Sequence, residues 1–157
     1  MASSLPKPGH RALRKGRGSE SGRIYLVTTT THRRIPYFAK WELASRMSAV
    51  MDRDDTWLPH AQLLCWILMP DHWHGLVQLS DATSLSKVIG LAKGRSARAV
   101  GRVARPSGQI WAAGFHDRAM RCDDDVLTAA RYIVTNPVRA GLVTSIRYYP
   151  YWNSIWL

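Results

Sequence analysis

Strand-like and helix-like spacings of apolar residues follow one another along the chain from residue 23 onward. Residues 24–31 read IYLVTTTT, a β-branched and aromatic run that predicts a first strand. Residues 38–52 place apolar side chains three or four positions apart, which predicts a helix. The positions that carry this helical spacing are Leu43, Met47, Val50 and Met51.

A nearly continuous apolar run over residues 62–69 predicts a central strand covered on at least one face. Pro70-Asp71 interrupts the run, and residues 72–79 resume a strand pattern. Because proline and aspartate together mark a turn, we expect a short hairpin between these two strands.

The second half of the chain predicts two more helices and one extended segment. Apolar spacing predicts a helix over 85–103, and residues 110–120 read as a strand or extended segment after a loop at 106–108. Asp123-Asp124-Asp125 begins a third helix, because acidic side chains are favourable near the positive end of the helix dipole. Pro137 is expected to end it, since the residue before proline avoids helical geometry.

The order β-α-β-β-α-β with one added helix near the C-terminus is that of the ferredoxin-like fold. We therefore expect an α+β chain with an antiparallel sheet, in which the added helix carries Tyr132. With 157 residues, the chain is most simply one domain with a real core, over residues 23–157. The tryptophans expected in this core are Trp41, Trp57 and Trp66.

The net charge of the chain indicates which class of binding partner it favours. Lys and Arg number 22 against 11 acidic residues, a formal net charge of +11. This imbalance favours nucleic acid ahead of an acidic membrane surface, with a merely basic soluble protein as the alternative. Residues 1–22 form a basic, flexible tail that could order on a phosphate backbone or serve only to solubilise the chain. Its basic side chains include Arg14, Lys15 and Arg17.

Cysteine usage and the lack of long apolar stretches favour a cytoplasmic location. Cys65 and Cys122 form neither a disulfide framework nor a CxxC metal motif. The N-terminal residues contain no apolar stretch of the kind a signal peptide needs. No run of about 18 apolar residues is present, so no membrane span is expected.

His72-Trp73-His74 is the first candidate for chemistry. Residues two apart on a strand point to the same face, so the two imidazoles could hold one divalent ion while Trp73 packs on the opposite side. The alternative is a pair of histidines that occurs by chance or is hydrogen-bonded in the core.

Tyr132 and Asn136 are the second candidate, because residues four apart share one face of a helix. This face lies away from the apolar stripe of the same helix. The alternatives are an exposed tyrosine and an ordinary helix-ending asparagine. The stripe consists of Val126, Ala130, Ile133 and Val134.

Together these residues suggest phosphoryl transfer to a tyrosine. A phenol with a pKa of about 10 is a weak nucleophile at neutral pH. Mg²⁺ or Mn²⁺ held by His72, His74 and the Asn136 oxygen would act as a Lewis acid on a phosphate. His116 and Asp117 are possible neighbours of the site. A zinc hydrolase with His116 as third ligand, and a binding module that does not cut, remain alternatives.

Arginines offer further contacts to DNA phosphates or bases. One group steps along the second helix, where a solvated face is the alternative, and another brackets the tyrosine helix. The first group is Arg95, Arg98, Arg102 and Arg105, and the second is Arg118, Arg121, Arg131 and Arg139.

Two sequence blocks resemble the HUH single-tyrosine transposases, specifically the REP-associated tyrosine transposases. The blocks are Met69-Pro70-Asp71-His72-Trp73-His74 and Tyr132-Ile133-Val134-Thr135-Asn136-Pro137-Val138-Arg139-Ala140-Gly141-Leu142-Val143. Shorter matches are Tyr25-Leu26-Val27-Thr28, Gly114-Phe115-His116-Asp117-Arg118 and Tyr149-Pro150-Tyr151-Trp152.

The resemblance implies a metal-dependent, site-specific endonuclease and strand transferase for single-stranded DNA. By the resemblance, His72 and His74 bind the metal and Tyr132 becomes linked to a 5′-phosphate. Asn136 occupies the position that completes the metal site, where relatives in insertion sequences carry glutamine. The implied substrate is a REP-like hairpin, and the implied setting is the bacterial nucleoid. Either a monomer or a homodimer is compatible with the resemblance.

Overall fold

The computed structural model describes residues 21–102 and 108–157. The basic side chains Arg14, Lys15 and Arg17 of the tail, and Arg105 of the second helix, lie outside these residues. Within them, no helix is both long enough and apolar enough to cross a bilayer.

Five strands form one sheet in the order β4-β1-β3-β2-β5, and every neighbouring pair is antiparallel. This order confirms the predicted α+β, ferredoxin-like fold. β3 is the central strand and pairs along its length with β1 on one side and β2 on the other. The strands are β1 (Ile24–Thr30), β2 (Ala61–Met69), β3 (His72–Leu79), β4 (His116–Ala119) and β5 (Trp152–Ser154).

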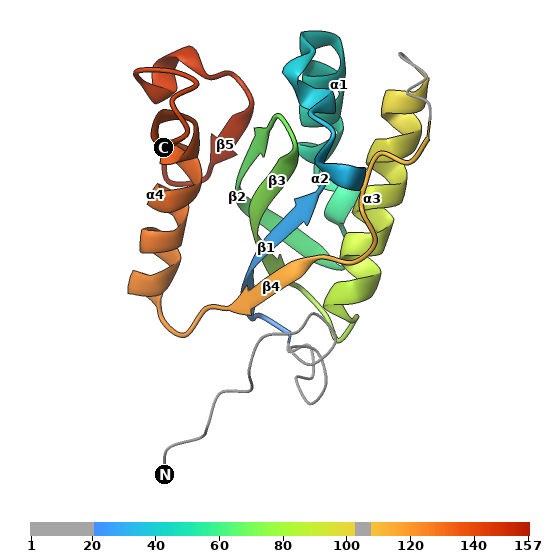
Figure 1. The fold of residues 1–157 in the computed structure, drawn as a ribbon. Coiled ribbons are helices and arrows are strands. Elements are labelled where there is room, and N and C mark those ends of the chain that lie inside the picture. Colours follow the sequence, from blue (N-terminus) through green and yellow to red (C-terminus); the bar gives the residue numbers. More distant parts are fainter. Residues whose placement is uncertain (1–20, 103–107) are drawn as a thin grey trace.

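Helices cover both faces of the sheet (Figure 1). The first three helices pack on one face, and the fourth covers the other. Short 3-10 turns at His32–Arg34, Tyr37–Ala39 and Ile146–Tyr148 connect the elements. The helices are α1 (Trp41–Met51), α2 (Asp54–Trp57), α3 (Leu85–Gly101) and α4 (Asp123–Arg139).

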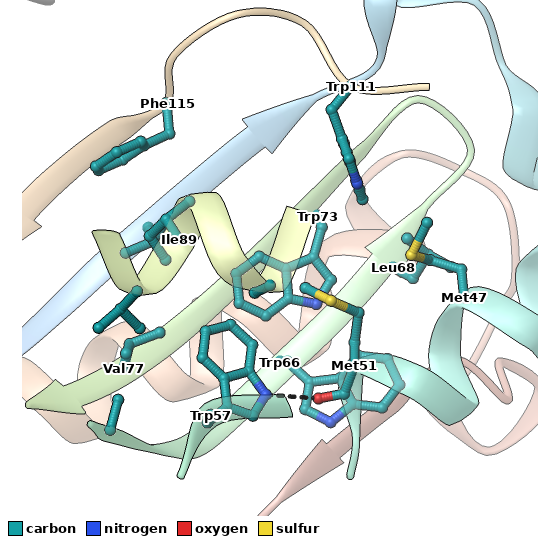
Figure 2. Packing of buried hydrophobic residues seen from close by; sticks show 14 of the residues in the cluster. Met47, Met51, Trp57, Trp66, Leu68, Trp73, Val77, Ile89, Trp111 and Phe115 are labelled. Atoms are coloured by element: carbon teal, nitrogen blue, oxygen red, sulfur yellow. Dashed lines mark hydrogen bonds between the residues drawn. The ribbon is translucent and has the colours of Figure 1, made fainter. Parts of the chain in front are cut away.

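The face under α1, α2 and α3 holds a core rich in tryptophan and methionine (Figure 2). Trp73 is fully buried there and stacks on Trp57, with ring centroids 5.7 Å apart and planes at 19°. The Trp57 indole donates to the carbonyl of Met51 at 2.8 Å, which ties α2 to the end of α1. Trp73 thus packs away from its two histidine neighbours, as its spacing predicts.

Gly75 is required by the position of Trp73. A Cβ atom on Gly75 would lie 2.1 Å from Cη2 of the Trp73 ring, far inside van der Waals contact. The indole therefore lies flat over the backbone of its own strand two residues further on. Only glycine leaves this space open on the face that Trp73 occupies.

The opposite face of the sheet packs against α4 through a smaller, mainly aliphatic cluster. Alternation along β3 sends Leu76 into this cluster and Val77 into the other one. The even-numbered residues of β3, including both histidines, therefore face the α4 side. The buried members are Leu64, Cys65, Ile67, Met69, Leu76, Met120, Val126, Ala129, Ala130, Ile133 and Val134.

Pro137 does not end the third predicted helix, contrary to the prediction. α4 continues through it to Arg139. Proline removes one N–H donor, yet its own carbonyl still accepts a bond from Leu142 at 2.9 Å, and the Asn136 carbonyl accepts one from Ala140 at 2.9 Å. The helix thus lacks one hydrogen bond, from position 137, while the carbonyls of Asn136 and Pro137 remain bonded.

Other boundaries differ more locally. In the predicted segment 110–120, only His116–Ala119 is a strand, because Gly114 turns the backbone at a φ of 75°. Residue Trp111 before that turn makes an isolated bridge with Thr31. The placement of Trp41 in the core is wrong, since 67% of it is exposed at the start of α1.

Candidate active site

His72 and His74 lie side by side on the α4 face of the central strand. Their ring centroids are 4.6 Å apart and the ring planes meet at 77°. Across the sheet, β1 places Thr30 opposite His72 and Thr28 opposite His74. Because β3 is paired on both sides, the two imidazoles start from a rigid backbone.

Each imidazole has a hydrogen-bonding partner at Nδ1. The Thr28 hydroxyl lies 2.7 Å from Nδ1 of His74, and Asp71 Oδ1 lies 2.7 Å from Nδ1 of His72. The second oxygen of Asp71 accepts a bond from Arg34 Nε at 3.1 Å. These contacts leave Nε2 as the remaining nitrogen of each ring.

His74 is held in its neutral form at physiological pH. Burial lowers its pKa to about 3, and the positive charges of His72, Arg139 and Arg34 act in the same direction. The pKa of Asp71 is also lowered: burial opposes this, but the hydrogen bond from His72 and the charges of His72 and Arg34 outweigh it. A neutral imidazole is the form that binds a metal ion.

Tyr132 projects from α4 toward the histidine pair. Its ring centroid lies 6.5 Å from that of His74, and 52% of the residue is exposed. Its neighbours on α4 towards the core, Ile133 and Val134, are buried, so helical periodicity directs the phenol out of the aliphatic cluster. The prediction that Tyr132 lies off the core face is confirmed.

Arg139 covers the phenol ring of Tyr132. Its guanidinium carbon is 3.9 Å from the ring centroid, a cation–π contact. Arg139 also donates to the Tyr132 carbonyl at 2.7 Å and to the hydroxyl of Thr135. A positive charge is therefore fixed beside the phenol by contacts within one helix.

A cleft of about 520 Å³ opens between α4 and the sheet, with Tyr132 and His74 both in its wall. It is large enough for part of a nucleotide, and its wall mixes apolar side chains with cationic and hydroxyl groups. The lining residues are Leu26, Thr28, His74, His116, Asp117, Arg118, Thr128, Ala129 and Tyr132.

The structure brings His116 and Asp117 to this cleft, as the sequence predicts. Thr28 on β1 pairs with His74 on one side and with His116 on the other, so these three residues form one row across the sheet. Arg118 lines the same cleft. Both histidine-bearing strands thus contribute to one concave surface.

Asn136 lies one turn beyond Tyr132 on α4 and is half-buried. It is not among the described residues that line the cleft. The described parts of the chain also contain no group of three or more His, Cys, Asp or Glu residues arranged to hold a metal. Among the described residues, His116 therefore forms no such group with His72 and His74.

The donor set fits a loosely held catalytic cation. The imidazoles of His72 and His74, each with Nε2 unoccupied by the contacts above, can supply two ligands, and an amide oxygen such as that of Asn136 could supply a third. Such a set leaves coordination positions for phosphate and water, which a structural zinc site does not.

The predicted arginine contacts divide between the two faces. Arg95, Arg98 and Arg102 belong to α3 or its end, on the side of the sheet away from the histidines. Arg95 donates to the carbonyls of Asp55 and Thr56 at 2.9 and 2.6 Å, so it has a structural role. Arg118 lines the cleft, Arg131 and Arg139 belong to α4, and Arg121 lies in the chain between β4 and α4.

Three residues near the histidines had no predicted role: Thr28, Asp71 and Arg34. Asp71 precedes His72 in the sequence, a signal that could have been used. Thr28 is apparent only once the register between β1 and β3 is known. Arg34 sits in a 3-10 turn with a positive φ of 56°, which the sequence gives no reason to expect.

Comparisons with known proteins agree with this geometry. The family model described as "Transposase IS200 like" matches residues 20–136. A solved structure of a REP-associated tyrosine transposase bound to a REP hairpin is similar, with a TM-score of 0.66 and 20% identity, over 96% of this chain and 82% of that one. The structure of a protein from Deinococcus radiodurans R1 assigned as a transposase is also similar, with a TM-score of 0.50 and 18% identity. This match covers 76% of this chain and 95% of that one. No curated protein matches the sequence.

Proposed function

Because the chain belongs to the family of IS200-like transposases, we propose that it is a metal-dependent, single-tyrosine endonuclease and strand transferase for single-stranded DNA. Membership in this enzyme family confirms the resemblance found in the sequence motifs. The observation that carries the proposal is the meeting of Tyr132, His74 and His72 beside one cleft.

Tyr132 is the proposed nucleophile. Its phenolic oxygen would bond to the phosphorus of the scissile phosphate, the P–O3′ bond would break, and the product would be a 5′-phosphotyrosine and a free 3′-OH. The phenol proton leaves to solvent and the departing oxygen takes one up. A 3′-OH from a second strand can reverse the reaction, so no external energy source is required.

Arg139 is placed to assist this attack. A guanidinium 3.9 Å from the ring centroid favours the developing phenolate and can also bind a phosphate oxygen. The contact is within one helix, so it exists before DNA binds. This preorganisation supports Tyr132 as the reactive tyrosine.

His72 and His74 are the proposed metal ligands, with Asn136 as the third. The ion, Mg²⁺ or Mn²⁺, would supply Lewis-acid polarisation of the scissile phosphate when bound. The lowered pKa of His74 supports this role, because the ring stays neutral at physiological pH without a metal. The binding module that does not cut would need neither the tyrosine nor this ligand pair.

The proposed substrate is hairpin DNA with a single-stranded extension. The support is the fold shared with the REP-associated tyrosine transposase, whose structure holds a REP hairpin, and the net charge of +11. Arg118 in the cleft, Arg121 just before α4 and Arg131 on α4 are proposed phosphate contacts. Arg98 on α3 and Arg102 at its C-cap are proposed for a more distant segment. Either a monomer or a homodimer could do this.

The test is covalent capture of labelled single-stranded oligonucleotides that carry hairpins from the chain's own genomic neighbourhood. Protein and DNA are incubated with Mg²⁺, Mn²⁺ or a chelator and separated on a denaturing gel. An adduct that needs the metal and is absent in Tyr132→Phe is the expected result. Tyr148→Phe is the matched control, because Tyr148 is also exposed (72%). An adduct that survives Tyr132→Phe would overturn the proposal, and hairpin binding without any adduct would favour the binding module.

A further inference from the structure

The two histidines are oriented by partners of different chemistry. His72 meets a carboxylate oxygen of Asp71, and His74 meets the hydroxyl of Thr28, each at 2.7 Å from Nδ1. A neutral imidazole carries one proton, and its partner at one nitrogen decides which nitrogen keeps a lone pair.

Asp71 determines the form of His72. An ionised carboxylate only accepts hydrogen bonds, so Nδ1 of His72 must be the donor and Nε2 keeps its lone pair. Arg34 holds the other carboxylate oxygen at 3.1 Å, which fixes the carboxylate in place. The backbone carbonyl of Asp71 accepts bonds from the Thr31 N–H at 2.9 Å and the Thr31 hydroxyl at 3.1 Å. The residue that accepts from the His72 imidazole is thus held by three hydrogen bonds.

Thr28 occupies the corresponding position for His74. It lies directly opposite His74 in the β1–β3 register, so its hydroxyl reaches Nδ1 from the neighbouring strand. At 2.7 Å the hydroxyl leaves no room for a metal ion at that nitrogen. Only Nε2 of His74 can then serve as a ligand atom. When it does, Nδ1 carries the ring proton and donates to the threonine oxygen, which as a hydroxyl oxygen can accept.

We propose that Asp71 and Thr28 are positioning residues that select the Nδ1–H form of His72 and His74 and so present both Nε2 atoms as metal ligands. This inference rests on the proposed metal-dependent function. Partners of this kind matter most where few protein ligands hold the ion, and their loss typically weakens metal binding about 10- to 100-fold.

The first test determines which ring nitrogen of each histidine carries the proton in the metal-free protein. Protein with ¹⁵N-labelled histidine is studied by two-bond ¹H–¹⁵N NMR, and the signals are assigned with His72→Gln and His74→Gln. Wild-type protein is expected to show both rings as Nδ1–H. Asp71→Asn should shift His72 alone toward a mixture of forms, and Thr28→Val should shift His74 alone. Thr28→Ser retains the hydroxyl and is expected to restore the wild-type signals.

The second test measures Mn²⁺ affinity by electron paramagnetic resonance on the same proteins. Asp71→Asn and Thr28→Val are each expected to weaken binding about 10- to 100-fold. Two controls match the chemistry of these changes away from the site. Asp55→Asn removes a carboxylate from an exposed ion pair with Arg53, and Thr29→Val removes a hydroxyl that faces the opposite core and has no partner among the described residues.

The outcomes separate this inference from the proposed function. Unchanged imidazole forms and unchanged Mn²⁺ affinity in folded Asp71→Asn and Thr28→Val would overturn the positioning roles. Variants and controls that weaken binding equally would do the same. If wild-type protein binds no Mn²⁺ while each imidazole responds to its own partner, the metal-dependent function fails and the assignment of Asp71 and Thr28 as the partners that orient the rings stands.

Discussion

The guanidinium of Arg139 lies over the phenol ring of Tyr132, seven residues earlier on the same helix, at 3.9 Å from the ring centroid. The same guanidinium donates to the Tyr132 carbonyl at 2.7 Å. Both ends of the tyrosine, its backbone and its ring, therefore contact one cation. This links the proposed nucleophile to a charge that the DNA need not supply.

Arg139→Ala is expected to slow formation of the covalent DNA adduct by about 10-fold or more, because the phenol loses the charge that favours its ionised form. Arg139→Lys should be intermediate, since lysine keeps the charge but lacks the planar stacking surface. Single-turnover kinetics at saturating DNA measures this step. Arg46→Ala removes an exposed charge from α1, on the other face of the sheet, and is the control. Equal losses in both variants would mean that only overall charge matters.

Gly75→Ala is expected to destabilise the protein by about 1–3 kcal/mol, as overpacking of a core does. The added methyl would meet Trp73, whose ring cannot withdraw because it is fully buried and stacked on Trp57. Urea unfolding followed by tryptophan fluorescence gives the change in unfolding free energy.

Gly90→Ala is the matched control for that substitution. Gly90 lies inside α3, where a Cβ atom meets nothing within 4 Å. Alanine there should raise the unfolding free energy by roughly 0.5–1 kcal/mol, because glycine is the poorer helix former. If both variants change stability in the same direction, the clash at Trp73 is not the cause.

His74 makes stability depend on pH in a defined direction. Folding lowers its pKa from 6.5 to about 3, so between these values the unfolded chain binds a proton that the folded chain does not. The stability that neutral His74 allows is fully present above pH 6.5 and is lost as the pH falls toward 3. Over this range the free energy of unfolding changes by up to about 1.4 kcal/mol per pH unit. Urea unfolding across this range should show a shallower slope for His74→Gln. Parallel slopes would contradict the prediction.

The two thiols are expected to differ sharply in reactivity. Burial raises the pKa of Cys65 to about 11, and its sulfur lies 4.0 Å from the Ala130 carbonyl under α4. Cys122, just before α4, is exposed. A thiol reagent should modify one cysteine quickly in the native protein and the second only in denaturant. Cys122→Ser should remove the fast phase. Fast modification of Cys65 would show that α4 separates from the sheet under native conditions.

The sheet could be predicted because its strands have simple patterns. The run over Ala61–Met69 is almost entirely apolar, and His72–Leu79 follows after a proline turn, so both strands and their hairpin were predicted nearly to the residue. β5 was missed, because three residues at Trp152–Ser154 carry too little pattern to identify a strand. Short edge strands are set by what they pair with rather than by their own sequence.

The residues of the candidate site likewise differ in whether their own sequence pattern predicts them. His72, His74 and Tyr132 could be predicted because strand and helix periodicity alone sets their direction. Thr28 and Arg34 could not, because their contacts depend on β1–β3 register and on a turn between elements. The continuation of α4 through Pro137 was also missed, because the preference of the residue before proline for extended geometry is a tendency that the surrounding structure can override.

The pairing of β3, the central strand, on both of its sides determines which half of the candidate active site a regulator could displace. Its amides are bonded to β1 and β2 on both sides, whereas α4 is held to the sheet mainly by side chains. In hydrogen exchange, β3 amides should open only with global unfolding, and α4 amides through smaller local openings. The histidine half of the site is then as durable as the fold itself. Control by a bound strand or partner would have to act on the tyrosine helix, which can be displaced while the histidines stay in place.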